Sequence, residues 1–248
     1  MALNLDRTVF ITFDVDWACD EVIEDSLGLI ENGDARATFF LTHSSAVFDK
    51  HLNSTSIELG AHPNFNGLLD GNSTVEGMRQ VVKNIREIAP SAVSVRSHSL
   101  TQNTKLLDIF HEYGFTHDVN LLIPAQSGMI LRPFVNWGGL IRAPYFWEED
   151  IHCIFQSEGK EVGWDVGKFL EIPGLKIFNF HPIHVFLNTE RLTRYDECRP
   201  YHKDVNELIG HKNGNPLEGT RFFLNSLIAE VKRREMSFGL IREITVNG

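Results

Sequence analysis

Val9-Phe10-Ile11-Thr12-Phe13 is typical of a short buried strand, and it runs directly into Asp14-Val15-Asp16. Polar residues that follow a buried strand are where parallel-sheet proteins place their chemistry. The next stretch, 21–31, has apolar residues at helical spacing and is followed by Gly33, so we expect a helix that ends there. A second apolar strand is expected over 38–42. This strand–helix–strand order favours a parallel sheet.

The same alternation continues along the chain. We expect helices over 45–52, 74–89, 104–113 and 217–234, and strands over 57–59, 92–95, 175–180 and 240–244, with another beginning at 115. The stretch 121–164 is irregular and rich in Gly, Pro and Trp, and 188–216 is expected to be a polar loop region. The pattern predicts an α/β fold with a parallel sheet, open or closed into a barrel. No linker or repeat is evident, so one domain is expected over 1–248.

Composition excludes several classes of protein. The chain has 248 residues, of which 42% are hydrophobic and 23% charged, which is ordinary for a folded domain. Its formal net charge of −10 disfavours binding to nucleic acid. The apolar runs are too short for a membrane span, and the first ten residues do not resemble a secretory signal, so a cytoplasmic location is expected. The three cysteines fit no disulfide framework or paired-cysteine zinc site and are predicted to be reduced thiols.

Chemically active side chains follow the other predicted strands as well. His62 follows the third strand, Arg96 and His98 follow the fourth, and His181 and His184 follow Phe180. Carboxyl ends of parallel strands meet at one edge, so these residues and Asp14 and Asp16 should converge. Two carboxylates two residues apart can take different roles, one binding a metal and the other moving a proton. The sequence therefore predicts a metallohydrolase-type site, although His62 or His98 alone would more often be a hydrogen-bonded loop histidine.

Two motifs resemble a known family. Thr12-Phe13-Asp14-Val15-Asp16 is similar to the Thr-Phe-Asp-Asp-Gly motif of the polysaccharide deacetylases (carbohydrate esterase family 4, NodB homology domain), with one residue inserted between the acids. Ala37-Thr38-Phe39-Phe40 matches a further run of that family. The resemblance covers nearly the whole chain and implies a distorted (β/α) barrel of the NodB type. It also implies that Asp14 is the catalytic base and Asp16 a metal ligand.

The family's metal-binding and arginine motifs are altered here. Its His-Ser/Thr-x-x-His motif aligns with 60–66, which keeps His62 but has Asn66 in place of the second histidine. The third ligand is therefore either Asn66 or a histidine from another loop, and we select His98. The Arg-Pro-Pro-Tyr motif aligns with 95–100, where the prolines and tyrosine are absent. The resemblance implies that Arg96 orients Asp14 and favours its charged form.

The remaining expectations concern the acid and the substrate. Asn179-Phe180-His181 resembles the family's Leu-x-His motif, which implies that His181 is the general acid, while Asp118 and Asp165 are candidates for the carboxylate that holds its imidazole. A backbone N–H near Ser99 is expected to stabilise the oxyanion. Tyr145 and Trp147 are expected to contact substrate by stacking on a sugar ring, with core packing as the alternative.

Together these motifs imply a metal-dependent N-deacetylase. The expected substrate is an acetamido sugar in a polysaccharide, a glycolipid or a nucleotide-linked precursor, in the context of surface-polysaccharide or O-antigen assembly. The expected cofactor is a divalent ion, most simply Zn²⁺. Two alternatives remain open: a hydrolase of a small non-sugar amide on the same fold, and a glycan-binding protein that has lost its metal.

Overall fold

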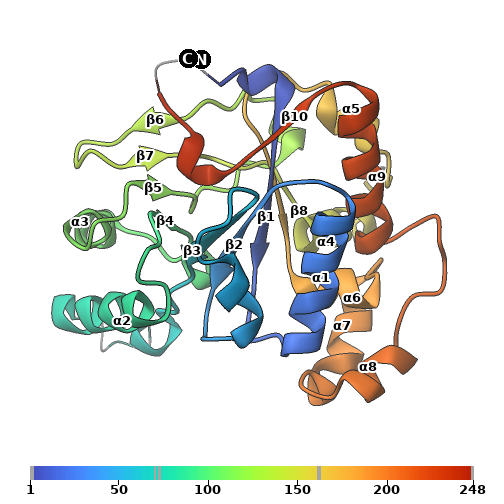
Figure 1. Cartoon of the computed structure of the whole chain (residues 1–248), viewed down its shortest axis with the longest axis horizontal. Helices are drawn as coiled ribbons and strands as arrows, with labels where there is room; N and C mark the ends of the chain where they lie inside the picture. The colour runs from blue at the N-terminus through green and yellow to red at the C-terminus, as the bar shows by residue number, and fades with distance from the viewer. Residues whose placement is uncertain (1–2, 70, 72–73, 161–162, 247–248) are drawn as a thin grey trace.

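A computed structural model describes residues 3–69, 71, 74–160 and 163–246. Within these residues the chain forms one ten-stranded sheet surrounded by helices (Figure 1). The strands are β1 (Thr8–Asp14), β2 (Ala37–Leu41), β3 (Ile57–Ala61), β4 (Ser94–Val95), β5 (His117–Asp118), β6 (Phe134–Val135), β7 (Ile141–Arg142), β8 (Trp147–Glu148), β9 (Lys176–Phe180) and β10 (Ser237–Gly239).

The sheet curls into a distorted barrel. Its strand order is β6-β7-β5-β4-β3-β2-β1-β9-β8, with β10 paired to β1, and every pair is parallel except β6 with β7. Backbone hydrogen bonds join the segment after β5 to the segment before β8, including Tyr145 N–H to Leu121 O at 2.9 Å. Phe13 pairs with both Phe39 and Phe180, so three strands end at one level. The expected (β/α) barrel is confirmed.

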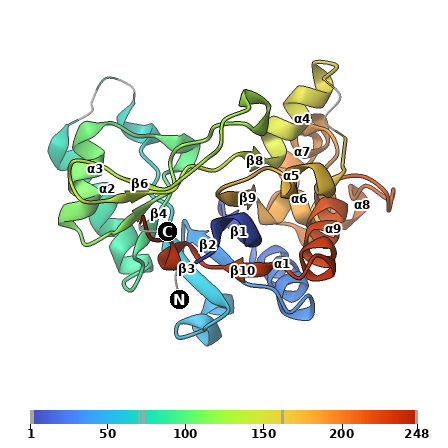
Figure 2. The same ribbon diagram turned by 90° about the horizontal axis from the view of Figure 1, so that it is seen from above.

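Helices cover the outside of this sheet. Figures 1 and 2 show α2 and α3 on the side of β3–β5, and α1, α6 and α9 on the opposite side. None of the helices in the described part of the chain is both long and apolar enough to span a membrane. The helices are α1 (Asp20–Asn32), α2 (Val75–Ile88), α3 (Thr104–Glu112), α4 (Glu149–Ser157), α5 (Val166–Leu170), α6 (Pro182–Leu187), α7 (Leu192–Cys198), α8 (Val205–Gly210) and α9 (Thr220–Arg233).

Alternate side chains along the strands face an apolar outer layer and a polar interior. In β1, Phe13 stacks on Phe39 at 4.5 Å between ring centroids, whereas Thr12 and Asp14 point to the other face, as alternation requires. On that inner face, Thr12 hydrogen-bonds Asn179 at 3.0 Å. The barrel therefore buries polar side chains inside and a hydrophobic layer under its helices. The polar interior can persist only because its groups are hydrogen-bonded to one another.

Several helix boundaries follow the predicted signals. The apolar positions of α1 are buried, and Gly33 ends it by donating its N–H to Leu29 O at 3.0 Å. A Cβ at Gly33 would lie 2.8 Å from Leu29 O, so no larger residue fits without a shift. Thr74 caps α2 by accepting the N–H of Gly77 at 3.0 Å. The three cysteines are free thiols, as predicted.

The structure corrects four expectations for secondary structure. The strand predicted over 240–244 is a 3₁₀ turn, because Glu243 folds back to accept the Leu240 N–H and pairs with Arg36 at 2.5 Å; the strand lies earlier, at β10. The stretch 188–216 contains α7 and α8, the latter capped by Asp204. The helix predicted over 45–52 is a 3₁₀ helix, Ala46–His51. The irregular stretch 121–164 contains β6–β8 and α4.

Candidate active site

Asp14 is the buried carboxylate at the centre of the barrel mouth. It ends β1, is 4% exposed, and accepts hydrogen bonds from Arg96 Nη1 and Asn179 Nδ2, each at 3.0 Å. Arg96 has no exposed surface and also donates to Thr12 Oγ1 at 3.0 Å and Val119 O at 3.2 Å. Both oxygens of Asp14 are therefore fixed in position. The structure brings Arg96 and Asp14 together, as predicted from the sequence.

The guanidinium of Arg96 is held between two aromatic rings. Its Cζ lies 4.6 Å from the centroid of Phe40 and 4.5 Å from that of Tyr145. A desolvated arginine between two ring faces gains cation–π attraction and keeps its planar fork aligned with its acceptors. Phe40 of β2 and Tyr145, which precedes β8, thus orient Arg96, and Arg96 in turn orients Asp14.

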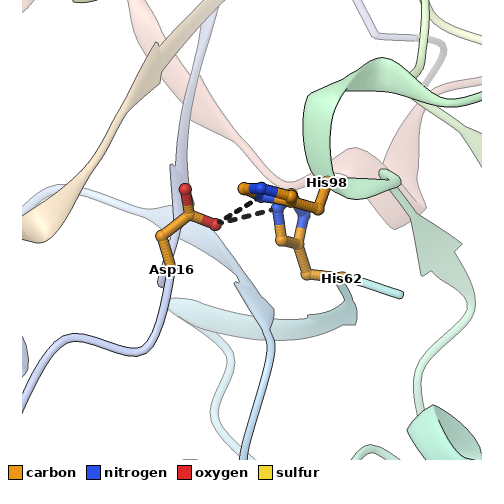
Figure 3. A group of neighbouring side chains, drawn as sticks. All are labelled: Asp16, His62 and His98. Carbon is orange, nitrogen blue, oxygen red and sulfur yellow. Dashed lines mark hydrogen bonds and ion pairs between the residues drawn. The ribbon is translucent and has the colours of Figure 1, made fainter. Parts of the chain in front are cut away.

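Asp16, His62 and His98 converge on one another (Figure 3), and His62 Nδ1 lies 3.6 Å from Asp14 Oδ1. Asp16 Oδ1 lies 3.1 Å from His62 Nε2 and 3.2 Å from His98 Nδ1. One ligand atom from each of the three residues lies within 4.8 Å of the others. One carboxylate and two imidazoles are a common donor set for a catalytic divalent metal, particularly zinc. The three side chains chosen from the sequence as metal ligands form one cluster.

Backbone hydrogen bonds and left-handed backbone conformations position Asp16, His62 and His98. The His62 N–H donates to Leu41 O and the His98 N–H to Pro63 O, both at 2.9 Å, so three loops are tied together. Asp16 has a left-handed backbone with φ 43°, and Ser99, just after His98, has φ 54°. Left-handed non-glycine residues cost roughly 1–3 kcal/mol each and gather at functional sites. Asn66, the alternative third ligand, lies exposed in a short 3₁₀ turn (Asn66–Leu68).

Mutual pairing controls the charges of the cluster. Burial alone would raise the pKa of Asp16, but hydrogen bonds with His62 and His98 outweigh burial and hold it well below its usual range. The hydrogen bond that His98 Nδ1 donates to Asp16 raises the pKa of His98. Without a metal the Asp16 carboxylate is therefore charged, and the raised pKa of His98 favours a proton there that compensates it. A divalent cation would replace that proton.

Glu149 holds the imidazole of His181, which corrects the sequence prediction. Its Oε1 lies 3.1 Å from His181 Nδ1 and accepts the His181 backbone N–H at 2.5 Å. Burial lowers the pKa of His181, but Glu149 outweighs this and sets it well above the ordinary value. Neither Asp118 nor Asp165 serves this role: Asp118 pairs with Arg142 at 2.7 Å, and Asp165 caps α5.

Two further carboxylates were missed from the sequence, Glu148 and Asp150. Together with Asp14, Asp16, Ser99, His98 and His181 they line a cavity of about 130 Å³. Burial raises the pKa of Glu148 to about 6, and its Oε2 accepts from Tyr145 Oη at 2.6 Å. Burial also raises the pKa of Asp150, but His184 at 3.1 Å lowers it to about 2. The available signal was an acidic run, 148–150, directly after a strand.

The chain resembles known polysaccharide deacetylases over most of its length. A family model described as WbmS-like polysaccharide deacetylase matches residues 11–199, which is more than half of the chain. A Bordetella bronchiseptica structure, described as a proposed polysaccharide deacetylase involved in O-antigen biosynthesis, is 39% identical, with 91% of each chain covered and a TM-score of 0.83. The chain belongs to the WbmS-like polysaccharide deacetylases. A search of curated proteins found no match.

More distant structures share the fold of this family member. The Bc1960 peptidoglycan N-acetylglucosamine deacetylase is 13% identical over 96% of this chain and 87% of its own, with a TM-score of 0.53. A Bacillus anthracis protein described as a carbohydrate esterase family 4 pseudoenzyme is also 13% identical, over 96% of this chain and 65% of its own, with a TM-score of 0.51. At such identities the comparison shows the fold alone, and both an enzyme and a pseudoenzyme have it.

Tyr145 and Trp147 do not form an open sugar platform in this deacetylase-family chain. Tyr145 is fully buried with one face on Arg96, and its pKa is raised well above 10 by burial. Trp147 is 3% exposed and stacks on Phe223 with centroids 4.2 Å apart. The alternative of core packing is correct for both, because the segment 145–147 enters the barrel wall. Ser99 does line the cavity.

A second group, Glu149, His181 and His184, also has metal-ligand spacing. Its members already have other partners: Glu149 holds His181, and His184 lies 3.1 Å from both Thr189 Oγ1 and Asp150 Oδ1. These partners fix the two rings by hydrogen bonding. The cluster of Asp16, His62 and His98 is therefore the better candidate for a metal.

Proposed function

We propose that this protein hydrolyses the N-acetyl group of an acetamido sugar in a metal-dependent reaction. One observation carries the proposal. Asp14, a carboxylate fixed by an arginine, shares a cavity with Asp16 and His98 of the candidate metal cluster and with His181, whose imidazole is held by a buried glutamate. This is the set of groups that amide hydrolysis needs: a base, an electrophile site and an acid.

The residues present fit a divalent cation. Asp16, His62 and His98 would hold it, and the buried Nδ1 of His62 has no hydrogen-bond partner among the described residues; its nearest acidic oxygen is Asp14 Oδ1 at 3.6 Å. Two nitrogens and one oxygen favour zinc over the oxygen-preferring magnesium or calcium. When bound, the ion supplies Lewis-acid polarisation of the acetyl carbonyl and a lower pKa for the attacking water.

The chain's own residues then divide the proton transfers. Asp14 accepts the proton of the attacking water, and its two fixed oxygens keep a lone pair directed at the cavity. A backbone N–H near Ser99 stabilises the oxyanion. His181, kept protonated by Glu149, donates to the sugar nitrogen as the carbon–nitrogen bond breaks, which releases acetate and a free amine.

The class of substrate is proposed from the related protein. The Bordetella bronchiseptica structure is described in terms of O-antigen biosynthesis, which supports a surface glycan or its precursor as the substrate. A neutral acetamido sugar suits a cavity that contains four carboxylates.

Acetate release tests the proposal. Purified protein, reconstituted with Zn²⁺, is incubated with acetamido sugars and with small cyclic amides; acetate released from the sugars is measured enzymatically, and ring opening of the cyclic amides is measured by chromatography. We expect acetate from a sugar, and a loss of at least about a hundredfold in kcat for Asp14→Asn and for His181→Gln. Asp165→Asn, which only caps α5, is the matched control and retains the rate. Turnover of the cyclic amides alone, or equal rates for Asp14→Asn and wild type, would contradict the proposal.

A further inference from the structure

A second hollow lies beside the candidate metal cluster and contains an exposed tryptophan. Trp17, directly after Asp16, is 39% exposed and lines a hollow of about 180 Å³. The hollow is also lined by His62, by Asn64 and by two residues of α2, Asn84 and Ile85. An exposed indole beside a mixture of polar and apolar side chains is more typical of a ligand-binding site than of a hydrophobic core.

The backbone at Trp17 favours a functional reason for this side chain. Its φ is 57°, in the left-handed region, where a bulky residue is a genuine outlier and glycine is the residue without strain. Its N–H donates to Thr42 Oγ1 at 3.1 Å, which fixes the conformation. A sequence selected for stability alone would place glycine here. The indole is thus retained at a cost, and its exposed face gives no packing in return.

The hollow adjoins the catalytic cavity. His62 lines the hollow and Asp16 lines the cavity, and His62 Nε2 lies 3.1 Å from Asp16 Oδ1. The ring of His98, which also lines the cavity, lies edge-on to the Trp17 ring with centroids 5.1 Å apart. A sugar on Trp17 would therefore lie next to a sugar in the cavity, with these side chains between them.

The walls of the hollow have the chemistry that a sugar requires. The apolar C–H face of a pyranose packs on an indole, and its hydroxyl groups need hydrogen-bonding partners when they leave water. Asn64 and Asn84 place amide groups on this wall, and Ile85 adds an apolar surface. Aromatic and amide groups together suit a neutral carbohydrate.

The charge of the lining residues distinguishes between the possible substrates that contain the acetamido sugar. No lysine or arginine is among the described residues that line either the cavity or the hollow, whereas Asp14, Asp16, Glu148 and Asp150 line the cavity. A nucleotide-linked sugar would bring a diphosphate with no cationic side chain to pair with it. The lining therefore favours an uncharged neighbour over a nucleotide.

We propose that Trp17 and this hollow bind the sugar adjacent to the one that is deacetylated, so that the substrate is a neutral glycan of at least two sugars. This inference rests on the proposed function for the identity of the reacting sugar. It adds the subsite, its recognition residue and the exclusion of nucleotide-linked precursors.

Binding of three probes tests the inference. N-acetylglucosamine, its β-1,4-linked disaccharide and UDP-N-acetylglucosamine are titrated into chelator-treated protein by calorimetry. The variants are Trp17→Ala, Trp17→Phe and, as a matched control, Trp137→Ala. Trp137 is an exposed tryptophan of the turn before β7, and it lines neither the cavity nor the hollow. Circular dichroism verifies that each variant is folded.

We expect the disaccharide to bind the wild type and Trp137→Ala about tenfold more tightly than the monosaccharide, the factor that one stacking contact provides. The ratio should fall to about one in Trp17→Ala and be largely retained in Trp17→Phe. The nucleotide sugar should bind less tightly than the disaccharide. An unchanged ratio in Trp17→Ala, preference for the nucleotide sugar, or binding of none of the probes would overturn the inference.

Acetate release separates the two levels of the proposal. If acetate is released while the ratio does not depend on Trp17, the subsite is wrong and the deacetylase remains. If the ratio depends on Trp17 and no acetate is released under any metal, the subsite stands and the chain is a glycan-binding protein.

Discussion

Replacing Glu149 by Gln should shift the pH at which His181 stops acting as an acid. The substitution keeps the shape of the side chain, and the amide oxygen can still accept the His181 backbone N–H. It removes the negative charge 3.1 Å from Nδ1. Because Glu149 is fully buried, solvent screens this interaction little. The change therefore isolates the electrostatic effect on one imidazole.

The expected magnitude follows from the strength of a charged hydrogen bond. Such a bond contributes about 1.5–3 kcal/mol, and about 1.4 kcal/mol corresponds to one pKa unit, so the pKa of His181 should fall by roughly 1–2 units. His181 must be protonated to donate, so activity falls as pH rises through its pKa. The alkaline limb of kcat/KM should therefore move to lower pH by roughly 1–2 units.

Two assays measure this shift. The pH profile of acetate release gives the alkaline limb, and NMR titration of the histidine Cε1 protons gives the pKa of His181 directly in chelator-treated protein. Asp150→Asn is the matched control, since the Asp150 carboxylate contacts His184 and raises the pKa of His181 less than Glu149 does. An alkaline limb that stays in place for Glu149→Gln, or that moves further for Asp150→Asn, would refute the assignment of Glu149 as the partner of His181.

Three other predictions concern stability. Arg96→Met should lower the free energy of unfolding by about 3–5 kcal/mol, since Asp14 would be left buried without its cation; urea unfolding measures this, and a change under about 1 kcal/mol would contradict the pairing. The pKa of Glu148 is raised from 4.5 to about 6, so the folded state binds its proton more tightly than the unfolded state, and this stabilisation of roughly 2 kcal/mol is lost as pH rises from below 4.5 to above 6. The free energy of unfolding of Glu148→Gln, measured by urea in the presence of chelator below pH 4.5 and above pH 6, should lack this pH dependence. An unchanged pH dependence in Glu148→Gln would show that another group causes it. Trp147→Ala should cost about 3–5 kcal/mol while the folded protein keeps its KM, because Trp147 packs on Phe223; a raised KM with unchanged stability would restore its role as a sugar platform.

The sequence predicts the framework of this fold well because its signals are local. The apolar run of β1, the stripe of α1 and the Thr74 cap each determine an element by themselves, and they lie where expected. Strand ends meet at one edge in a parallel sheet, so the sequence alone groups Asp14 and Asp16 with the histidines that follow the other strands.

The errors arise where a distant contact decides the outcome. The partner of His181 comes from α4, and no spacing in the sequence links 149 to 181. Trp147 has the composition of a sugar platform, yet Phe223, 76 positions later in the numbering, covers it. The 3₁₀ turn at 241–243 depends on Arg36 from the other end of the chain. Tertiary packing overrides local preference in each case.

Metal content tests the central claim most directly. Wild type, Asp16→Ala, His62→Ala, His98→Ala and Asn66→Ala are purified without chelator, reconstituted with Zn²⁺, and measured by elemental analysis. The account predicts near-stoichiometric zinc in the wild type and in Asn66→Ala, and its loss in the other three. Zinc retained by His98→Ala and lost from Asn66→Ala, or no zinc in the wild type after reconstitution, would contradict the account.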